Sequence, residues 1–463
     1  MVSILKFFAV LGDYIPSPPK PPRRPDLKFR LLFTFGALAI YFAMASVMVY
    51  PLANYNLQGV QLPALINVVF ASQQGTLAQL GIGPIVTAGL ILQILAGAKI
   101  LNIDMSDPQG RKLFTQSQKG LAVLIAVVEG LGFAMYYRLN LPFTLAIFMQ
   151  FFLGALILLI IDEAVQKGWG IGSGVSLFIL AGVARTIMWD MFAPVKVPGT
   201  DEYHGFVPYV IHGLLGGGIN NERLFYGLTE GVNRVLPSLT GFITVLVLSI
   251  ILIYLQSVKV NIPVTTQRAP GIRAKVPLQF LYVTNIPILL VGILFSDLIL
   301  FYNITSTYLA DTAPWLSEAL SIMITYLAPP NSLLELYINP LRVLIYSILL
   351  VGLAVVFGYM WVEIAGLNPA AQAENLIKAG LEIPGIRRNP KVLESLLARY
   401  IYPLTILSSI IVALVALTAD IFSAFGTGTG ILLAVGILQQ YYSTIAYERA
   451  LEAYPLLKKF IGE

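Results

Sequence analysis

Residues 81–89, with the sequence GIGPIVTAG, open an apolar run that reaches residue 101. A run of about 20 residues is long enough to cross a bilayer as a helix, yet this one begins with two glycines and a proline. Residues that weaken a helix are tolerated in lipid only where protein or a cavity covers the loosened backbone. We therefore expect this segment to lie in the interior of a helical membrane protein.

Two patterns occur twice in the chain. Residues 84–89 (PIVTAG) and 287–292 (PILLVG) share a Pro-Ile start and a final glycine. Residues 170–174 (GIGSG) and 426–430 (GTGTG) each lead directly into an apolar run. One such match is common among membrane helices, but two pairs at equivalent places indicate that the chain contains an internal duplication.

The composition agrees with a membrane protein. Of the 463 residues 57% are hydrophobic and only 11% are charged, which is too apolar for a soluble globular chain. There is no cysteine, so disulfides and thiolate metal sites are excluded. The two histidines, His204 and His212, lie in one loop without further metal-ligand residues, and we expect no metal and no cofactor.

Ten apolar segments are long enough to span a bilayer. We expect no cleavable signal peptide before them, because a proline-rich segment separates the N-terminus from the first apolar run. Residues 2–12 are expected to form a short amphipathic helix ahead of the membrane. The predicted spans are residues 31–51, 79–101, 119–137, 141–161, 171–192, 237–257, 278–301, 341–362, 400–419 and 428–447.

The positive charges predict the orientation, because lysine and arginine are enriched in cytoplasmic loops. With the N-terminus inside, most of the 29 lysines and arginines fall on the cytoplasmic side. This placement explains the net charge of +5 without nucleic acid, although it is compatible with an RNA-bearing cytoplasmic partner. Both termini are predicted to be cytoplasmic. The six exceptions are Arg138, Arg185, Lys196, Arg223, Arg234 and Arg342.

The duplicated segments occupy equivalent places in two five-span halves but cross the membrane in opposite directions. Such an inverted repeat places a pathway at the interface of the halves. We predict an all-α polytopic fold with ten transmembrane helices around a central pore. Its parts are a cytoplasmic segment (1–30), a first half (31–200), an external loop (201–236), a second half (237–447) with cytoplasmic loops 258–277 and 363–399, and a cytoplasmic tail (448–463).

Few ionisable groups fall inside the spans, whereas ion-coupled transporters keep such groups near the middle of the bilayer. Glu129 in the third span is the clearest candidate. The other carboxylates lie near span ends, where we expect solvated interfacial charges: Asp162, Glu163, Asp297 and Glu363.

Six apolar side chains in the opening turns of the duplicated spans can meet at the centre of the bundle. A ring of them would offer nothing to replace the hydration shell of an ion, so a constriction there would stay dry and closed. Ordinary helix packing is the competing interpretation for each residue. The six are Ile82, Val86, Val175, Ile179, Leu289 and Leu433.

These features together resemble the SecY family, the channel-forming subunit of the protein translocon, in its archaeal and eukaryotic-type branch. The resemblance rests on the ten spans and on residues 81–86, 170–174, 285–287, 384–387 and 428–430, which occur in the order of the family and cover nearly the whole chain. It implies a channel that translocates unfolded secretory polypeptides and releases hydrophobic segments into lipid. Bond chemistry is not expected, because no catalytic residues are recognisable.

The resemblance also implies roles for particular positions. The six apolar residues match the pore ring, and residues 63–76 match the plug, a short helix that blocks the outer funnel. Thr87, Glu129 and Asn285 match a polar cluster at the lateral gate, where spans 2 and 3 face spans 7 and 8. A few hydrogen bonds across a seam in lipid, at about 1 kcal/mol each, would hold the gate weakly shut.

Partners follow from the same resemblance. Arg268, Arg387 and Arg388 match positions that engage the ribosome or another cytosolic motor, and basic side chains suit ribosomal RNA phosphates. A SecE-type subunit, a small beta-type subunit, signal sequences, nascent polypeptides and membrane lipid are the other expected partners. The protein is predicted to reside in the cell membrane.

Two other functions fit parts of the pattern. A secondary transporter of a small solute also uses inverted repeats and interrupted helices, and it predicts a pocket at the bilayer midplane with saturable uptake. An intramembrane enzyme would need a catalytic pair within the bilayer, and Glu129 has no acidic or histidine neighbour in sequence.

Overall fold

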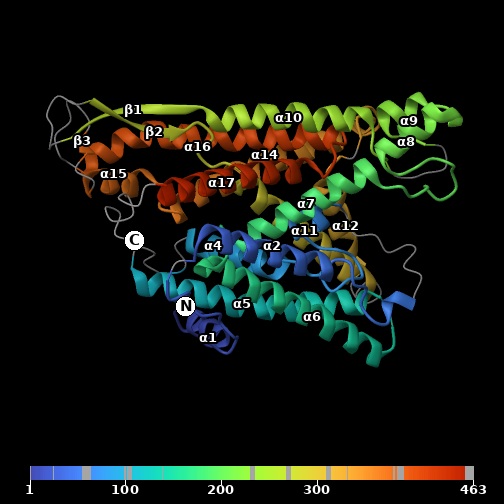
Figure 1. The fold of residues 1–463 in the computed structure, drawn as a ribbon, viewed down its shortest axis with the longest axis horizontal. Coiled ribbons are helices and arrows are strands. Elements are labelled where there is room, and N and C mark those ends of the chain that lie inside the picture. Colours follow the sequence, from blue (N-terminus) through green and yellow to red (C-terminus); the bar gives the residue numbers. More distant parts are fainter. Residues whose placement is uncertain are drawn as a thin grey trace.

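The computed structural model describes residues 2–23, 25–54, 64–97, 101, 107–137, 139–229, 235–266, 273–308, 314–330, 332–378, 381–382 and 390–453. Within these residues the chain is mostly helical (Figure 1). The first half contains α2 (Leu27–Met44), α4 (Gly83–Gly97), α5 (Pro108–Tyr136), α6 (Leu141–Ala164) and α7 (Gly174–Phe192). The second half contains α10 (Leu239–Ser257), α11 (Ile286–Tyr308), α14 (Pro340–Ile364), α16 (Pro390–Ile421) and α17 (Gly428–Ala453).

Shorter elements lie around these ten helices. The helices are α1 (Val2–Asp13), α3 (Ala64–Val69), α8 (Phe206–His212), α9 (Asn221–Tyr226), α12 (Pro314–Leu327), α13 (Glu335–Ile338) and α15 (Pro369–Lys378), with single turns η1 (Leu52–Asn54), η2 (Val165–Trp169) and η3 (Gly213–Gly217). The strands β1 (Lys259–Thr266), β2 (Arg273–Gln279) and β3 (Leu381–Glu382) form an antiparallel sheet in the order β2-β1-β3. The predicted all-α fold therefore carries one small sheet at one end.

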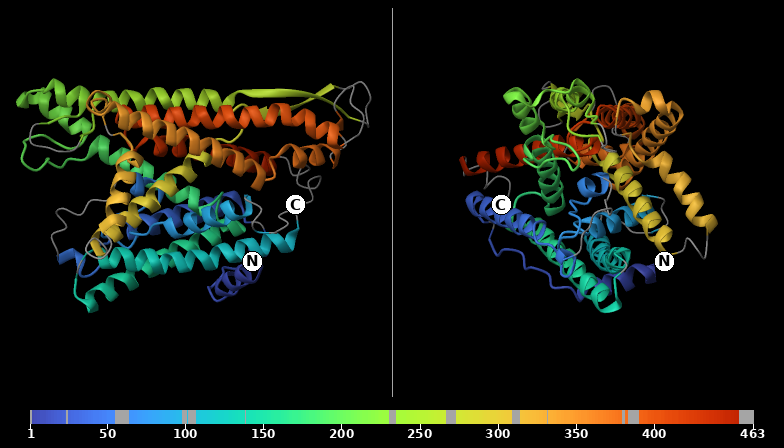
Figure 2. Two further views of the ribbon diagram at one scale, coloured as in Figure 1. Left: turned by 180° about the vertical axis from the view of Figure 1, so that it is seen from behind. Right: turned by 90° about the vertical axis from the view of Figure 1, so that its right-hand side faces the viewer.

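The two halves lie side by side, with α7 and α11 between them (Figures 1 and 2). The sheet, α15 and α1 lie at one end of the molecule, and α8 and α9 lie at the other (Figure 1). We call these the hairpin end and the α8–α9 end. The amphipathic α1 packs along α5, where the hydroxyl of Ser117 donates a hydrogen bond of 2.9 Å to the Leu5 carbonyl.

Among the residues that the structure describes, seven helices are long and apolar enough to cross a membrane by themselves. Helices α4, α11 and α17 correspond to the other three predicted spans, and all three border the interface between the halves. The predicted start of the seventh span at residue 278 was wrong, because β2 continues to Gln279 and pairs there with Lys259. Helices α5 and α16 begin about ten residues before the predicted spans.

The duplication is visible in how two aspartates hold the following helix. Asp162 of α6 accepts a hydrogen bond of 2.9 Å from the backbone N–H of Val175, at the start of α7. Asp420 of α16 accepts one of 2.7 Å from Gly428, at the start of α17. A carboxylate at a helix N-terminus satisfies backbone donors that have no partner within the helix. Asp162 is 5% exposed, so its predicted role as a solvated charge was wrong.

Two other span-end carboxylates are also bound by neighbours. Glu163 forms 2.8 Å ion pairs with Lys119 and Lys167. Glu363 accepts a hydrogen bond of 2.9 Å from the side chain of Asn368. These contacts fix the ends of α6 and α14 at the hairpin end.

At the α8–α9 end, the side chain of Arg223 is buried rather than solvated. Its guanidinium is buried, lies 4.8 Å from the centre of the Tyr209 ring, and donates hydrogen bonds to the carbonyls of Tyr203, His204 and Pro237. Burial lowers the pKa of Arg223 to about 10, so the side chain remains charged at neutral pH. These bonds connect α9 to described residues on both sides of it along the chain.

Candidate functional site

The six apolar residues singled out from the sequence converge at the interface of the two halves. Ile82, Ile179 and Leu433 are at most 1% exposed and belong to one buried cluster, and the other three pack against that cluster while partly exposed. They come from α4 and the turn before it, α7, α11 and α17. The other three are Val86, Val175 and Leu289.

A cavity of about 1210 Å³ leads to this ring from the hairpin end. Five ring residues line it, with Ile82 buried behind them. The remaining lining mixes polar and apolar side chains and is almost uncharged, since Lys259 is the only charged residue among the described lining residues. Seven glutamines contribute: Gln93, Gln118, Gln166, Gln256, Gln279, Gln439 and Gln440.

The polar middle of α17 explains why this helix is not apolar enough to count as a span by itself. Gln439, Gln440 and Ser443 line the cavity, so this face of the helix meets water rather than lipid. A polar residue inside a membrane protein is tolerated where it faces a water-filled cavity. The site thus combines a wet vestibule with a dry apolar end.

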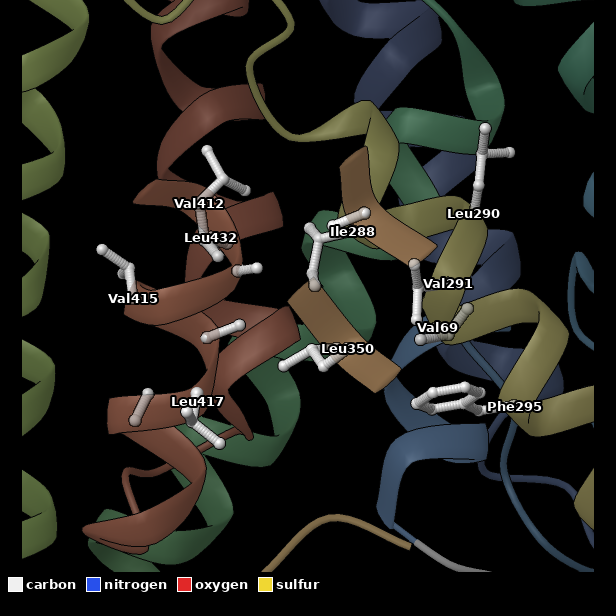
Figure 3. Packing of buried hydrophobic residues seen from close by; sticks show 14 of the residues in the cluster. Val69, Ile288, Leu290, Val291, Phe295, Leu350, Val412, Val415, Leu417 and Leu432 are labelled. Carbon is white, nitrogen blue, oxygen red and sulfur yellow. The ribbon is translucent and has the colours of Figure 1, made fainter. Parts of the chain in front are cut away.

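The short helix α3 closes the ring from the side away from the cavity. Val68 belongs to the same buried cluster as the ring. Figure 3 shows Val69 beside Val291 and Phe295 of α11. Two glycines make room for α3: an added Cβ would lie 2.9 Å from Val68 at Gly430 and 3.1 Å from Val69 at Gly292. Residues 64–76 of the predicted plug are described, and residue 63 lies outside the described residues.

The GIG sequence holds the end of this plug. Gly81 has a φ of +53°, and an added Cβ would lie 2.0 Å from the Phe70 carbonyl oxygen. The backbone N–H of Ile82 donates a hydrogen bond of 2.8 Å to the same carbonyl. On the other side, the Tyr41 hydroxyl donates one of 3.0 Å to the carbonyl of Ala71. The glycine is needed because a backbone approaches it closely at a left-handed conformation.

The seam between the halves is closed, with α4 packed on α11 and α14, and α5 packed on α11. The Thr87 hydroxyl of α4 lies 3.2 Å from both carboxylate oxygens of Asp297 on α11. Glu129 of α5 is buried, and its Oε2 would lie 3.3 Å from a Cβ added at Gly83, one turn before Thr87. Thr87 and Glu129 therefore border one face of α4.

The contacts described for Asn285 are with other residues. Its side chain accepts a hydrogen bond of 3.2 Å from the Thr284 hydroxyl, and its Nδ2 would lie 3.1 Å from a Cβ added at Gly436 of α17. It lines the cavity near the start of α11.

Asp297, rather than Asn285, forms the hydrogen bond with Thr87. Its predicted role as a solvated charge was therefore wrong. A carboxylate in the middle of an apolar run was the sequence signal for this position.

The three arginines expected to bind a cytosolic partner, Arg268, Arg387 and Arg388, lie outside the described residues. Their loops are flanked by described strands at the hairpin end, since β1 and β2 border the first loop and β3 precedes the second. In the part of the chain that the structure describes, no three histidine, aspartate or glutamate side chains are grouped as metal ligands.

Comparison with known proteins agrees with this arrangement. The family model of SecY matches residues 76–442. The protein translocase subunit SecY of Aeropyrum pernix is 47% identical over 470 residues, which cover 100% of this chain and 99% of that protein. The corresponding protein of Saccharolobus solfataricus is 44% identical over 475 residues and 100% of both chains.

Solved structures agree as well. One described as the structure of a protein conducting channel has a TM-score of 0.78 at 31% identity and covers 96% of this chain and 97% of its own. Sec61 in the canine ribosome-channel complex from the endoplasmic reticulum has a TM-score of 0.76 at 30% identity, with the same coverage. The fold is that of these channels, with ten membrane helices in two inverted halves. The chain belongs to the SecY family.

Proposed function

We propose that this protein is the channel through which unfolded secretory polypeptides cross the membrane and from which hydrophobic segments pass sideways into lipid. The observation that carries this function is the apolar ring, contributed by both halves, at the end of a cavity whose lining includes seven glutamines. Such a site conducts rather than catalyses. Membership of the SecY family makes the chain a multi-pass subunit of a protein translocase.

The ring acts as the seal. Its six side chains provide no oxygen atoms to replace the hydration shell of an ion, so the constriction stays dewetted when it is empty. Flexible apolar side chains can also pack around an extended polypeptide of any sequence, because dispersion contacts are not directional. The uncharged glutamine lining of the cavity favours no particular charge on the passing chain.

The plug and the gate keep the channel closed at rest. Val68 and Val69 pack against the ring and α11, so a translocating chain has to displace α3. Thr87, Glu129 and Asn285 are proposed to guard the lateral gate, with Asn285 at the entrance from the cavity and the other two deeper in the seam. Parting α4 and α5 from α11 and α14 would open a path to lipid.

The hairpin end is proposed to face the cytoplasm, which places both termini there in the cell membrane. Arg268, Arg387 and Arg388 would then engage a ribosome or another cytosolic motor, which supplies the driving energy. Canine Sec61 is described in a ribosome-channel complex. A SecE-type subunit clamping the halves and a small beta-type subunit would complete the translocon.

The test is site-specific crosslinking of a stalled nascent chain. Photoreactive residues at positions 82, 179 and 433 should crosslink to the chain in transit, because all three belong to the ring. A matched probe at Ile250, which is 68% exposed on α10, should face lipid and give no adduct. Crosslinks at Ile250 in place of the ring positions would refute the pore assignment.

A further inference from the structure

We propose that Asp297 is the α11 side of the lateral-gate contact and sets how hydrophobic a signal sequence must be to open the gate. The inference rests on the proposed channel function and adds a residue to it. It follows from one contact across the seam, between Thr87 and Asp297.

The geometry favours a direct latch. The Thr87 oxygen is equidistant from Oδ1 and Oδ2 of Asp297, at 3.2 Å. Thr87 is 8% exposed, and α4 packs directly on α11. Since Thr87 comes from the first half and Asp297 from the second, the hydrogen bond has to break when the halves part.

A second carboxyl group, that of Glu129, is buried at the same seam. Glu129 of α5 is 7% exposed, and its Oε2 would lie 3.3 Å from a Cβ added at Gly83, one turn before Thr87 on α4. The seam therefore brings together an acceptor group from each half and one hydroxyl donor. Separating the halves would leave the Asp297 carboxyl without its hydroxyl partner beside lipid, and polar groups at that depth are costly.

This cost defines the threshold. A signal sequence opens the gate when its own transfer into the seam releases more free energy than the closed contacts provide. A more hydrophobic signal releases more, because the gain scales with buried apolar area. Removing the Asp297 carboxyl should therefore allow weaker signals to open the gate.

The experiment measures the gate directly by pulsed electron paramagnetic resonance. The chain has no cysteine, so cysteines introduced at Ile91 of α4 and Tyr359 of α14, which are 38% and 45% exposed, are its only labelling sites. The translocon, purified with its associated subunits, is reconstituted in nanodiscs and titrated with a synthetic peptide carrying a lysine-flanked core of about ten leucines. Peptides in which alanines replace some leucines provide a series of decreasing hydrophobicity.

Wild-type protein should show one short distance that lengthens as peptide is added. Asp297→Leu should reach half-opening at a peptide concentration about three- to tenfold lower, the factor expected for one interhelical hydrogen bond. Asp297→Asn should fall between the two, because its amide oxygen still accepts from Thr87. The effects of Thr87→Val and Asp297→Leu should not add in the double variant, since each removes the same contact.

The matched control is Ser296→Ala. Ser296 precedes Asp297 on α11, is fully buried, and its hydroxyl has no hydrogen bond among the described residues. Its titration should match wild type. If Asp297→Leu also matches wild type while the peptide still lengthens the distance, Asp297 is not the latch. If the peptide has no effect on wild-type protein, the proposed gate itself is wrong.

Discussion

Arg30 of α2 and Glu448 of α17 form a buried ion pair, with Nη1 and Oε1 2.8 Å apart and side chains 9% and 11% exposed. The pair joins the first membrane helix of one half to the last helix of the other. Arg30 Nε also donates a hydrogen bond of 3.0 Å to the Gly170 carbonyl, and the Tyr441 hydroxyl of α17 donates one of 3.1 Å to Ser173. The two halves are thus tied together at the hairpin end.

Breaking this ion pair from one side should destabilise the protein. Glu448→Leu leaves the Arg30 charge buried without its partner, and we expect a loss of about 3 kcal/mol in unfolding free energy. The double variant Arg30→Met/Glu448→Leu should recover part of that loss, because the Arg30 charge is removed as well. Thermal unfolding of the purified complex in detergent measures both. A double variant that is less stable than Glu448→Leu would contradict this account.

The Tyr41 hydroxyl should stabilise the seated plug. Tyr41→Phe keeps the ring but removes the hydrogen bond to Ala71, at a cost of about 1 kcal/mol. In planar bilayers the fraction of time that the channel conducts ions should therefore rise about fivefold. Tyr442→Phe is the control, because Tyr442 is 76% exposed on α17. Equal conductance of the two variants would show that this bond does not hold the plug.

Widening the ring should make the closed channel leak. Changing Ile82, Val86 and Val175 to glycine removes apolar volume from the constriction, so water and ions can enter. We expect a larger ion conductance in planar bilayers without any substrate. Three glycines at Ile243, Val247 and Ile250, exposed on α10, control for weakened helices. Unchanged conductance of the ring variant would count against the seal.

Gly428→Ala should separate α16 from α17. An added Cβ would lie 2.1 Å from the Ala416 carbonyl oxygen, so the backbones cannot keep their present distance. We expect a loss of about 3 kcal/mol in unfolding free energy. Gly352→Ala is the matched substitution, since nothing lies within 4 Å of its added Cβ, and it should raise stability by roughly 0.5–1 kcal/mol. The two thermal midpoints in detergent should therefore move in opposite directions.

Much of the architecture follows from local sequence. Long apolar runs fix most of the membrane helices, since a helix is one of the few structures that satisfies its own backbone in lipid. The duplicated glycine-rich segments locate the four helix starts around the pore. The predicted plug and the amphipathic α1 also have the expected helices.

Other features could not be found in this way. The predicted cytoplasmic loop 258–277 includes β1 and most of β2. The hairpin could not be found from local sequence, because each strand is defined by its hydrogen bonds to the other strand. Asp162 looks like a solvated charge at a span end, because a sequence does not reveal that the next helix begins at its carboxylate.

The sequence by itself determined the ten membrane helices and the inverted repeat, because hydropathy and local glycine patterns depend only on neighbouring residues. Only the tertiary structure decided that Asp297, rather than Asn285, meets Thr87, and that the polar middle of α17 lines a cavity. The physical reason is that a partner more than 200 residues away along the chain is chosen by how two helices rotate and pack. That choice depends on the shapes of many side chains at once.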